Sequence, residues 1–396
     1  MPGGFVIAHT AANTPLDTTL ADAVAEIRVE QELSKATKYA VRFEEDICQG
    51  RPTALSAQSL QPGEILAVLV KDEHDQSVCL VRGPITKLKS SSVLGGPGSW
   101  LEVHGEDRRI EMDRTAVTSA WAGTATNIVS AILQNHHFAL DVRDSDAITF
   151  EDGTRSLNQS SPDLRVVNDL ARRLNYEFWI TYTVAARAST TANFDITETA
   201  AFKPSPDYGG PGGVEFPSPA PTLDMLTGTG EKVLRLNVPE GQCRNIRSFD
   251  LDVDVEKATA ALIHGINDRS GEDDEHEAAV EQPPVDPEGQ EAQATLARFH
   301  VTRTINHPGA GSAEDRGADA SATLASESWF ITARASTSAH LFPGVVQAHE
   351  IVRVEGTGFV HSGRYQVSKV LHVVNAWGHL MDLTLRRNAL PEALYG

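Results

Sequence analysis

Histidine and carboxylate side chains are the first candidates for chemistry in this chain, because imidazole and carboxylate groups bind metal ions. His136 and His137 fall near the end of a predicted helix, where neighbouring side chains point about 100° apart and cannot converge on one ion. A second group lies near the C-terminus and consists of His349, Glu350, His361, His372 and His379. Its spacing matches no known zinc motif. We therefore predict no metal site and no cofactor, and structural or exposed roles for these histidines.

Acid–base, phosphate-binding and nucleophilic sites have no better support. The pairs Glu44-Glu45 and Asp273-Asp274 suggest glycosidase carboxylates, but sequence neighbours face opposite sides of a strand and the second pair falls in an acidic loop. Both pairs are expected to be solvated. The glycine-rich residues 209–213 lack the Lys-Ser/Thr of a phosphate-binding loop and a following helix. No Gly-x-Ser-x-Gly elbow or Cys/His nucleophile signature occurs, so the sequence predicts that the protein is not an enzyme.

The charge balance and composition exclude further classes. The 396 residues include 34 Lys and Arg against 54 Asp and Glu, a formal net charge of −20, whereas nucleic-acid binding needs clustered positive charge. No apolar run reaches the roughly 18 residues of a membrane-spanning helix, and the first residues lack the pattern of a signal peptide. Cys48, Cys79 and Cys243 are widely spaced and odd in number, which favours synthesis in a reducing cytoplasm. We expect neither a membrane nor a sequence-specific nucleic-acid partner.

Alternating apolar residues predict a β barrel over residues 22–105, preceded by an N-terminal arm over residues 1–21. Ile27 and Val29 alternate with charged residues, a period of two that is typical of half-buried strands. The dipeptide Pro62-Gly63 predicts a turn before the apolar run 65–70. Short strands separated by turns indicate a compact antiparallel barrel or sandwich.

The pattern changes over residues 106–240, which predict a mixed α/β domain. Thr124 is expected to cap one helix, and Ser161 to cap a second that begins at Pro162. A strand is expected at residues 176–182 and a Pro/Gly-rich surface loop at 203–221. After this domain, the alternation of apolar and polar residues that is typical of strands returns.

Residues 241–396 predict a second β-barrel domain, with an acidic mobile loop at about residues 268–291. The predicted fold class is therefore mainly β with an α/β insert, in which two antiparallel β units flank a mixed α/β domain.

The two β-barrel domains share a pattern that suggests a duplication. Gly63 opens an apolar strand and Gly83 begins a second run about twenty residues later, while Gly344 and Gly363 repeat this arrangement. The following lysine lies two residues farther from its glycine in the second copy, and turn–strand patterns also recur by chance. We expect these four glycines at barrel corners, where a left-handed or tight backbone excludes other residues.

Several segments, in this order and spacing, resemble the hub proteins of contractile injection machines. The resembling family includes central baseplate hubs of phages, the late control protein D family and the N-terminal part of VgrG spike proteins. The segments that carry the resemblance are 80–86 (LVRGPIT), 103–109 (VHGEDRR), 161–164 (SPDL), 170–178 (LARRLNYEF), 356–358 (GTG), 362–367 (SGRYQV), 370–372 (VLH) and 385–388 (LRRN). The match extends from about Ile27 to Leu390.

The resemblance implies that the two β units are tube-type antiparallel β-barrel domains flanking the mixed α/β domain. It also implies a homotrimer that adapts a six-fold inner tail tube to a three-fold spike, in contact with other baseplate proteins. The spike is expected to be a separate polypeptide. Such a protein is made in the cytoplasm and assembled into a phage tail or injection particle. Phage and toxin-delivery particles both remain open, as do two alternative functions: a hub-associated peptidoglycan hydrolase and a carbohydrate-binding β module.

Overall fold

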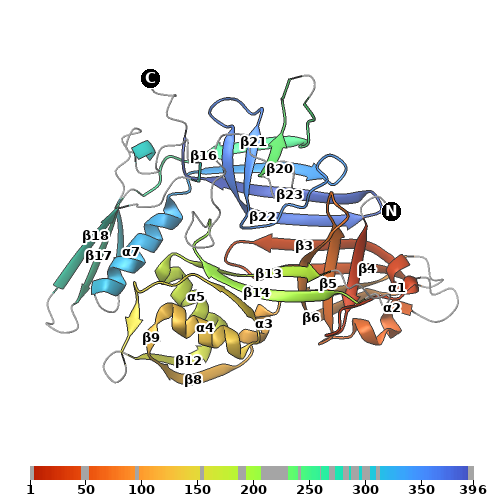
Figure 1. The fold of residues 1–396 in the computed structure, drawn as a ribbon, viewed down its shortest axis with the longest axis horizontal. Helices are drawn as coiled ribbons and strands as arrows, with labels where there is room; N and C mark the ends of the chain where they lie inside the picture. Colours follow the sequence, from red (N-terminus) through yellow and green to blue (C-terminus); the bar gives the residue numbers. More distant parts are fainter. Residues whose placement is uncertain are drawn as a thin grey trace.

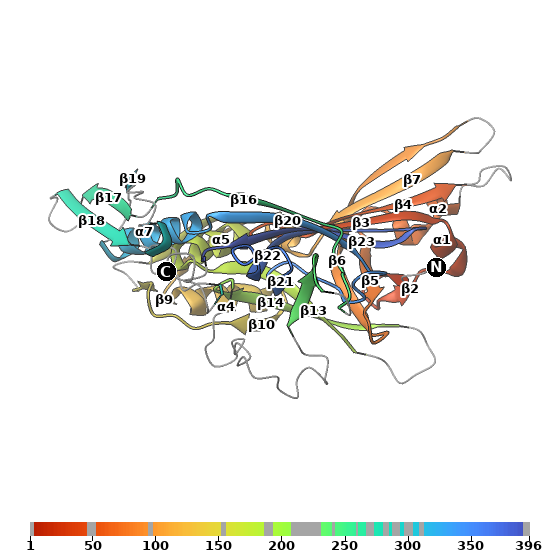
Figure 2. The same cartoon turned by 90° about the horizontal axis from the view of Figure 1, so that it is seen from above.

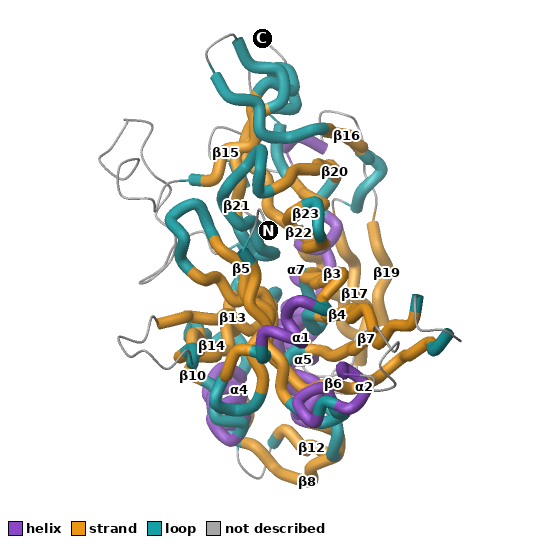
Figure 3. Tube along the Cα trace, turned by 90° about the vertical axis from the view of Figure 1, so that its right-hand side faces the viewer, coloured by secondary structure: helices purple, strands orange, loops and turns teal. Residues whose placement is uncertain are grey.

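The computed structural model describes residues 4–45, 53–93, 98–151, 156–185, 193–206, 231–239, 242–258, 260–266, 273–279, 285–286, 294–296, 304–308 and 313–390. Its largest element is one sheet of thirteen strands, to which an α/β part is attached (Figure 1). Strands dominate the trace in Figure 3. The predicted fold class, mainly β with an α/β insert, is confirmed. No helix among the described residues is long and apolar enough to cross a membrane.

The first barrel unit lies toward the N-terminus. Its strands are β1 (Phe5–His9), β3 (Val24–Glu32), β4 (Lys38–Glu45), β5 (Ile65–Lys71), β6 (Ser77–Ser91) and β7 (Ser99–Glu106). The predicted arm over residues 1–21 is wrong for the described part, because β1 pairs antiparallel with β5 along its full length. After a short β2 (Thr14–Pro15), the helix α1 (Thr18–Asp22) follows, capped by the side chain of Asp17. The short α2 (Thr53–Ser56) and the turn η2 (Gln58–Leu60) precede β5.

The second barrel unit is built from the C-terminal strands. These are β15 (Lys232–Arg235), β16 (Ser248–Val253), β20 (Ile331–Ser338), β21 (Ile351–Glu355), β22 (Gly363–Asn375) and β23 (Gly378–Arg387). All neighbouring strands of this unit are antiparallel except β15 and β21, which are parallel. The predicted alternation is present, since Phe249 and Leu251 face the core while Asp250 and Asp252 are exposed.

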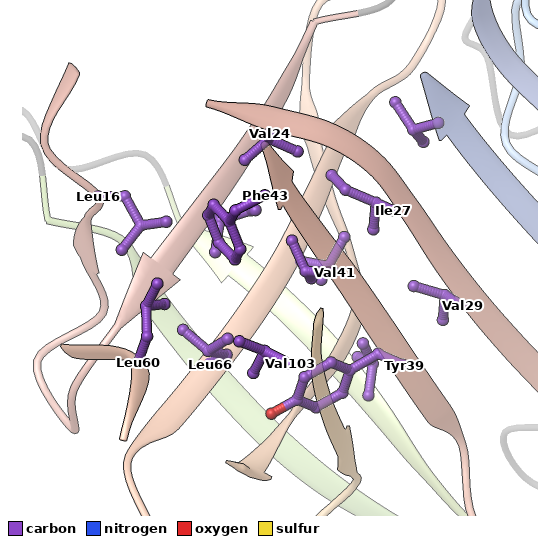
Figure 4. Packing of buried hydrophobic residues seen from close by; sticks show 14 of the residues in the cluster. Leu16, Val24, Ile27, Val29, Tyr39, Val41, Phe43, Leu60, Leu66 and Val103 are labelled. Carbon is purple, nitrogen blue, oxygen red and sulfur yellow. The ribbon is translucent and has the colours of Figure 1, made fainter. Parts of the chain in front are cut away.

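Each barrel unit has its own apolar core, and the period of two in the sequence supplies both. In the first unit Ile27, Val41 and Phe43 are fully buried and pack together with Leu66 and Val103 (Figure 4). The second core gathers side chains from β20 to β23 in the same manner. Alternation along neighbouring strands places every second side chain on the core face.

The mixed α/β part contains a helix pair and short sheets. Its elements are α3 (Arg109–Met112), β8 (Ala116–Trp121), β9 (Gly123–Thr124), α4 (Ala125–Asn135), β10 (Ala139–Val142), β11 (Thr149–Phe150), β12 (Leu157–Pro162), α5 (Asp163–Leu174), β13 (Glu177–Ala185) and β14 (Asp195–Lys203). Thr124 caps α4 as predicted, accepting a hydrogen bond from the amide of Asn127 at 3.2 Å. Ser161 does not cap α5, because it pairs with Val117 in the β12–β8 ladder and Pro162 takes the cap position.

The acidic segment predicted to be a mobile loop contains ordered parts. Asp273–Ala279 forms β18, which pairs with β17 (Ala260–Ile266), and β17 also pairs with β19 (Thr304–Pro308). Backbone pairing compensates for the lack of large apolar side chains here. A helix that the sequence analysis missed, α7 (Ala313–Glu327), lies beside this small sheet (Figure 1). The predicted Pro/Gly-rich loop 203–221 lies mainly outside the described residues.

Candidate assembly surfaces

The two barrel units have the same strand order. In the first it is β3-β4-β7-β6-β5, and in the second it is β16-β20-β23-β22-β21. The two units share a β-bulge at an equivalent position. It lies between Ile85 and Lys87 on β6 and between Val367 and Lys369 on β22. The lysine that follows each bulge is therefore equivalent in the two units. When the two bulges are aligned, Gly83 corresponds to Tyr365 and not to Gly363. The two units therefore share their strand order, but their glycines do not occupy equivalent positions.

A strand junction joins the two units within one chain. The C-terminal half of β22 pairs antiparallel with β3, so that Lys369 lies opposite Glu32 and Asn375 opposite Glu26 (Figure 1). Gln31 reinforces the junction from inside: its amide donates to the carbonyl of Leu80 at 2.9 Å, and its oxygen accepts from the amide of Ala348 at 3.1 Å. The result is one continuous sheet that extends from β16 through both units to β5, β1 and β2.

Charges along the outer face of this junction are complementary. The ammonium of Lys369 donates a hydrogen bond to Glu30 and lies 3.3 Å from a carboxylate oxygen of Glu32. The hydrogen bond with Glu30 raises the pKa of Lys369. Although partial burial opposes it, the hydrogen bonds from Lys35 and Lys369 lower the pKa of Glu32. At this junction a lysine of the second unit therefore contacts two glutamates of the first unit.

Two of the C-terminal histidines meet inside the junction. His372 Nδ1 and His379 Nε2 are 3.0 Å apart, and both side chains are buried. Burial lowers the pKa of His379 to about 4 and that of His372 well below its usual value, and the nearby His379 and Lys232 lower the latter further. The pair is therefore neutral, with one ring donating to the other.

A buried ionic cluster fixes the α/β part against the first unit. Asp107 holds the guanidinium of Arg109 at 2.7 Å, and Arg109 also donates to the carbonyls of Phe178 and Lys35 at 2.7 and 2.6 Å. Glu198 on β14 lies 3.0 Å from Arg82 and 2.6 Å from Arg108. Four of these five charges, all but Glu198, belong to the segments 80–86 and 103–109, which carried the resemblance.

The remaining histidines do not form a cluster. His349 stacks on Trp179 with ring centroids 3.9 Å apart and is hydrogen-bonded to Ser205 Oγ at 2.9 Å. Burial, together with nearby Arg109, Arg386 and Lys203, lowers its pKa well below the usual value. His136 contacts Asp163 at 2.8 Å, and His137 is exposed. Among the described residues, no group of three or more His, Cys, Asp or Glu side chains is arranged to hold a metal ion.

The carboxylate pairs differ from each other. Glu44 is exposed as expected, but Glu45 is buried, and the prediction that it is solvated is wrong. Its oxygens accept from the amides of Thr53 and Leu55 at 2.9 and 2.8 Å, which satisfies the free N–H groups at the start of α2. Asp273 and Asp274 lie in β18, and the glycine-rich residues 209–213 lie outside the described residues.

The four candidate glycines occupy different environments. Gly63 and Gly363 have φ of 94° and 139°, in the region that favours glycine. Gly344 has no positive φ, and a Cβ there would lie 2.8 Å from the ring of Phe342. Gly83 is also without a positive φ, but an added Cβ would lie 1.9 Å from the carbonyl oxygen of Glu106.

Replacing Gly83 with alanine is expected to lower the free energy of unfolding by about 1–3 kcal/mol, because the methyl group forces β6 away from the end of β7. Chemical denaturation at neutral pH measures the effect. Gly317→Ala in α7 is the matched control, since no atom lies within 4 Å of its added Cβ and alanine favours helix. Equal stability of the Gly83 variant and the wild type would contradict this account.

Two large apolar side chains are exposed at turns of the second unit. Trp377, in the turn between β22 and β23, is 90% exposed, and Phe359, between β21 and β22, is 65% exposed. Exposed aromatic residues at surface turns are suited to contact a partner. Nothing in their sequence neighbourhood distinguished them from core aromatics.

Comparison with known proteins identifies the fold. No family model and no curated protein sequence matches the chain. Among solved structures, the tail protein from Neisseria meningitidis MC58 matches with a TM-score of 0.61 and 12% identity, over 97% of this chain and 96% of that one. The 43 kDa tail protein of prophage MuSo2 from Shewanella oneidensis matches with a TM-score of 0.59 and 11% identity, over 98% of this chain and 100% of that one.

A chain of the half-lidded Francisella PdpA–VgrG complex is also similar, with a TM-score of 0.54 and 8% identity, over 98% of this chain and 58% of that one. These structural neighbours confirm, at the level of the fold, the resemblance found in the sequence. The chain therefore has the fold shared by phage tail proteins and by this chain of the VgrG complex.

Proposed function

We propose that this protein is the central baseplate hub of a contractile tail or injection machine, a homotrimer that joins a six-fold inner tube to a three-fold spike. The observation that carries the proposal is the repeated barrel unit, with one strand order and one bulge position in both copies. Three chains with two such units each present six similar surfaces, 3 × 2 = 6. A six-fold tube can rest on that ring while the α/β parts keep three-fold symmetry.

The continuous sheet supports a load-bearing role. Force applied to one unit passes to the other through the backbone hydrogen bonds of the β22–β3 junction, and the buried ions of Asp107 and Arg109 fix the α/β part to the first unit. The role is structural and not enzymatic, and the partners are the inner tube, the spike and other baseplate proteins. Assembly in the cytoplasm into a tail or injection particle is part of the proposal.

Native mass measurement tests the proposal directly. We expect a species of three times 42.7 kDa, alone or with candidate spike and tube proteins, and a three-fold particle with a six-fold-like face in electron microscopy. A stable monomer in the presence of both partner proteins would overturn the hub function. A peptidoglycan zymogram distinguishes the hub from a hydrolase, because a cleared band would contradict the structural role.

A further inference from the structure

The long sheet has a core face and an open face. Alternation along each strand sends every second side chain to a core, as at Ile27 and Leu383, and sends its neighbours to the opposite side. Arg28, Lys38 and Asp382 point to that opposite side and are exposed. We call this side of β16, β20, β23, β3, β4, β7 and the C-terminal halves of β22 and β6 the open face.

The α/β part lies on the other side of the sheet. Tyr182 and Val184 of β13 pack against Ala67 and Leu69 of β5, on the side of β5 that faces away from the first core. Figure 2 shows β5, β13 and β14 together on one side of β3, β16 and β20. The α/β part therefore adds its bulk behind the cores and not on the open face.

Acidic and basic side chains alternate across the strands of the open face. Lys38 of β4 lies directly opposite Glu30 of β3 on one side and Glu106 of β7 on the other. Arg42, four residues along β4, again has a glutamate opposite it on each neighbouring strand. Opposite charges on directly facing residues attract, so each of these cations is held between two acids.

Three cations on other strands have the same arrangement. Each has an acid directly opposite it, in the pairs Lys89–Glu102, Lys369–Glu32 and Arg334–Asp250. Arg28 has no acid opposite it, but its guanidinium lies 2.6 Å from Glu26 on its own strand. Lys87 lies opposite His104 and not opposite an acid. Most cations of the open face thus have a carboxylate beside them.

In the ring of six units proposed above, the two sides of the sheet are not interchangeable. Three α/β parts need more room than the centre of such a ring provides, so they lie outside and the open face turns toward the axis. We propose that the open face is the wall of the central passage and that its cross-strand charge pairs keep it from retaining a polyanion. The inference rests on the proposed trimeric hub and adds the surface chemistry of its passage.

Pairing of the charges explains why such a wall does not bind. Lysine and arginine hold nucleic acid by neutralising its phosphates, but on the open face a carboxylate already neutralises the cation and repels a phosphate. Facing residues of an antiparallel pair have Cα atoms only about 4.5–5.5 Å apart. Their opposite fields therefore cancel within the Debye length of about 8 Å at physiological salt. A passing polyanion meets neither strong attraction nor strong repulsion.

Removing acids from the open face tests the pairing. Glu26→Gln/Glu30→Gln/Glu102→Gln leaves Arg42 and Lys89 without a facing carboxylate. We expect the trimer of this variant to bind a short double-stranded DNA at low salt at least about tenfold more tightly than the wild-type trimer does. Fluorescence anisotropy of labelled DNA measures the affinity, and added salt is expected to abolish the gain.

A matched control separates charge pairing from net charge. Asp113→Asn/Asp144→Asn/Asp146→Asn removes the same number of negative charges from exposed positions of the α/β part. It is expected to leave DNA binding at the wild-type level, because no cation of the open face loses its partner.

A second variant keeps every acid of the open face in place. Ala40→Lys/Val373→Lys adds a lysine on each side of Arg28, at positions with no acid directly opposite. These new cations are free, so this variant is also expected to bind DNA. It guards against a loss of folding or of the β22–β3 junction in the variant that lacks three acids.

Chemical labelling tests the placement of the open face in the trimer. In a Cys48→Ser/Cys243→Ser background, Thr332→Cys puts a thiol on the open face of β20, and Asn168→Cys puts one on the exposed side of α5. Biotin maleimide is small enough to label both. We expect streptavidin, a folded tetrameric protein, to capture the trimer labelled at position 168 and not the trimer labelled at position 332.

The outcomes separate this inference from the hub function. A trimer whose open-face variants bind DNA no better than the Asp113→Asn/Asp144→Asn/Asp146→Asn control overturns the charge-paired wall, as does a wild-type trimer that binds DNA as tightly as they do. Capture by streptavidin at position 332 overturns the placement at the passage. Each of these results leaves the hub standing. A protein that remains monomeric with tube and spike proteins present overturns both.

Discussion

Replacing Asp286 with alanine is expected to lower the free energy of unfolding by about 3–5 kcal/mol, because it leaves a buried guanidinium without its counter-charge. Arg387 is 1% exposed and lies 3.0 Å from the Asp286 carboxylate. The same carboxylate accepts from the amide of Arg364 at 3.2 Å, and Arg387 donates to the carbonyl of Ser362 at 2.9 Å. Urea denaturation measures the loss.

Two controls assign this effect to the buried charge. Asp286→Leu/Arg387→Met removes both charges together, and we expect it to recover much of the loss because no ion stays unpaired. Asp169→Ala removes a carboxylate from a pair with Arg172 in which both side chains are mostly exposed, so little change is expected. If Asp286→Ala and Asp169→Ala had equal effects, the buried pair would have no special role.

Gly363 lies beside the ion pair of Asp286 and Arg387. A Cβ at this glycine would lie 2.4 Å from Asp286 Oδ2 and 2.8 Å from Arg387 Nη1, at a backbone φ of 139°. Gly363 is predicted at a barrel corner, but its neighbour Asp286 lies in the acidic segment that the sequence predicts to be a mobile loop. Asp286 and Arg387 are 101 residues apart, and no local pattern connects them.

Features of short range were predictable from the sequence. The alternation that buries Ile27 and Val29, and the cap at Thr124, depend on neighbours within a few residues. Glu45 shows the limit of that reasoning: a carboxylate at the end of a strand looks solvated until the chain returns and presents the amides at the start of α2.

The candidate assembly surface was predictable in part. The repeat of turn, apolar strand and lysine is visible in the sequence, including the displacement of two residues that the structure explains by aligning the bulges and not the glycines. The junction itself needed the structure, because β3 and β22 are more than 300 residues apart and strand pairing has no sequence motif of its own. The equivalence of β16 with β3 follows only from the ladders.

Acidification is expected to destabilise the fold through the His372–His379 pair. Both pKa values are lowered in the folded protein, that of His379 to about 4, while an unfolded histidine titrates near about 6.5. As the pH falls from about 6.5 to about 4, the unfolded chain binds protons that the folded chain excludes, so stability present above this range is progressively lost. For His379 alone the loss is about 3 kcal/mol. Urea denaturation at a series of pH values measures it.

The position of the pair makes this loss specific to the junction between the barrel units. His372 lies opposite Val29 of β3, so a charge on either ring is buried where the two units share their sheet, near the ammonium of Lys232. His372→Leu/His379→Leu is expected to flatten the pH dependence between pH 6.5 and 4, whatever its effect at neutral pH. His340→Gln removes an exposed histidine and should keep the wild-type slope. Parallel slopes for the wild type and the double variant would show that carboxylates elsewhere govern acid stability. A flattened slope would show that the β22–β3 junction holds because its two imidazoles stay neutral.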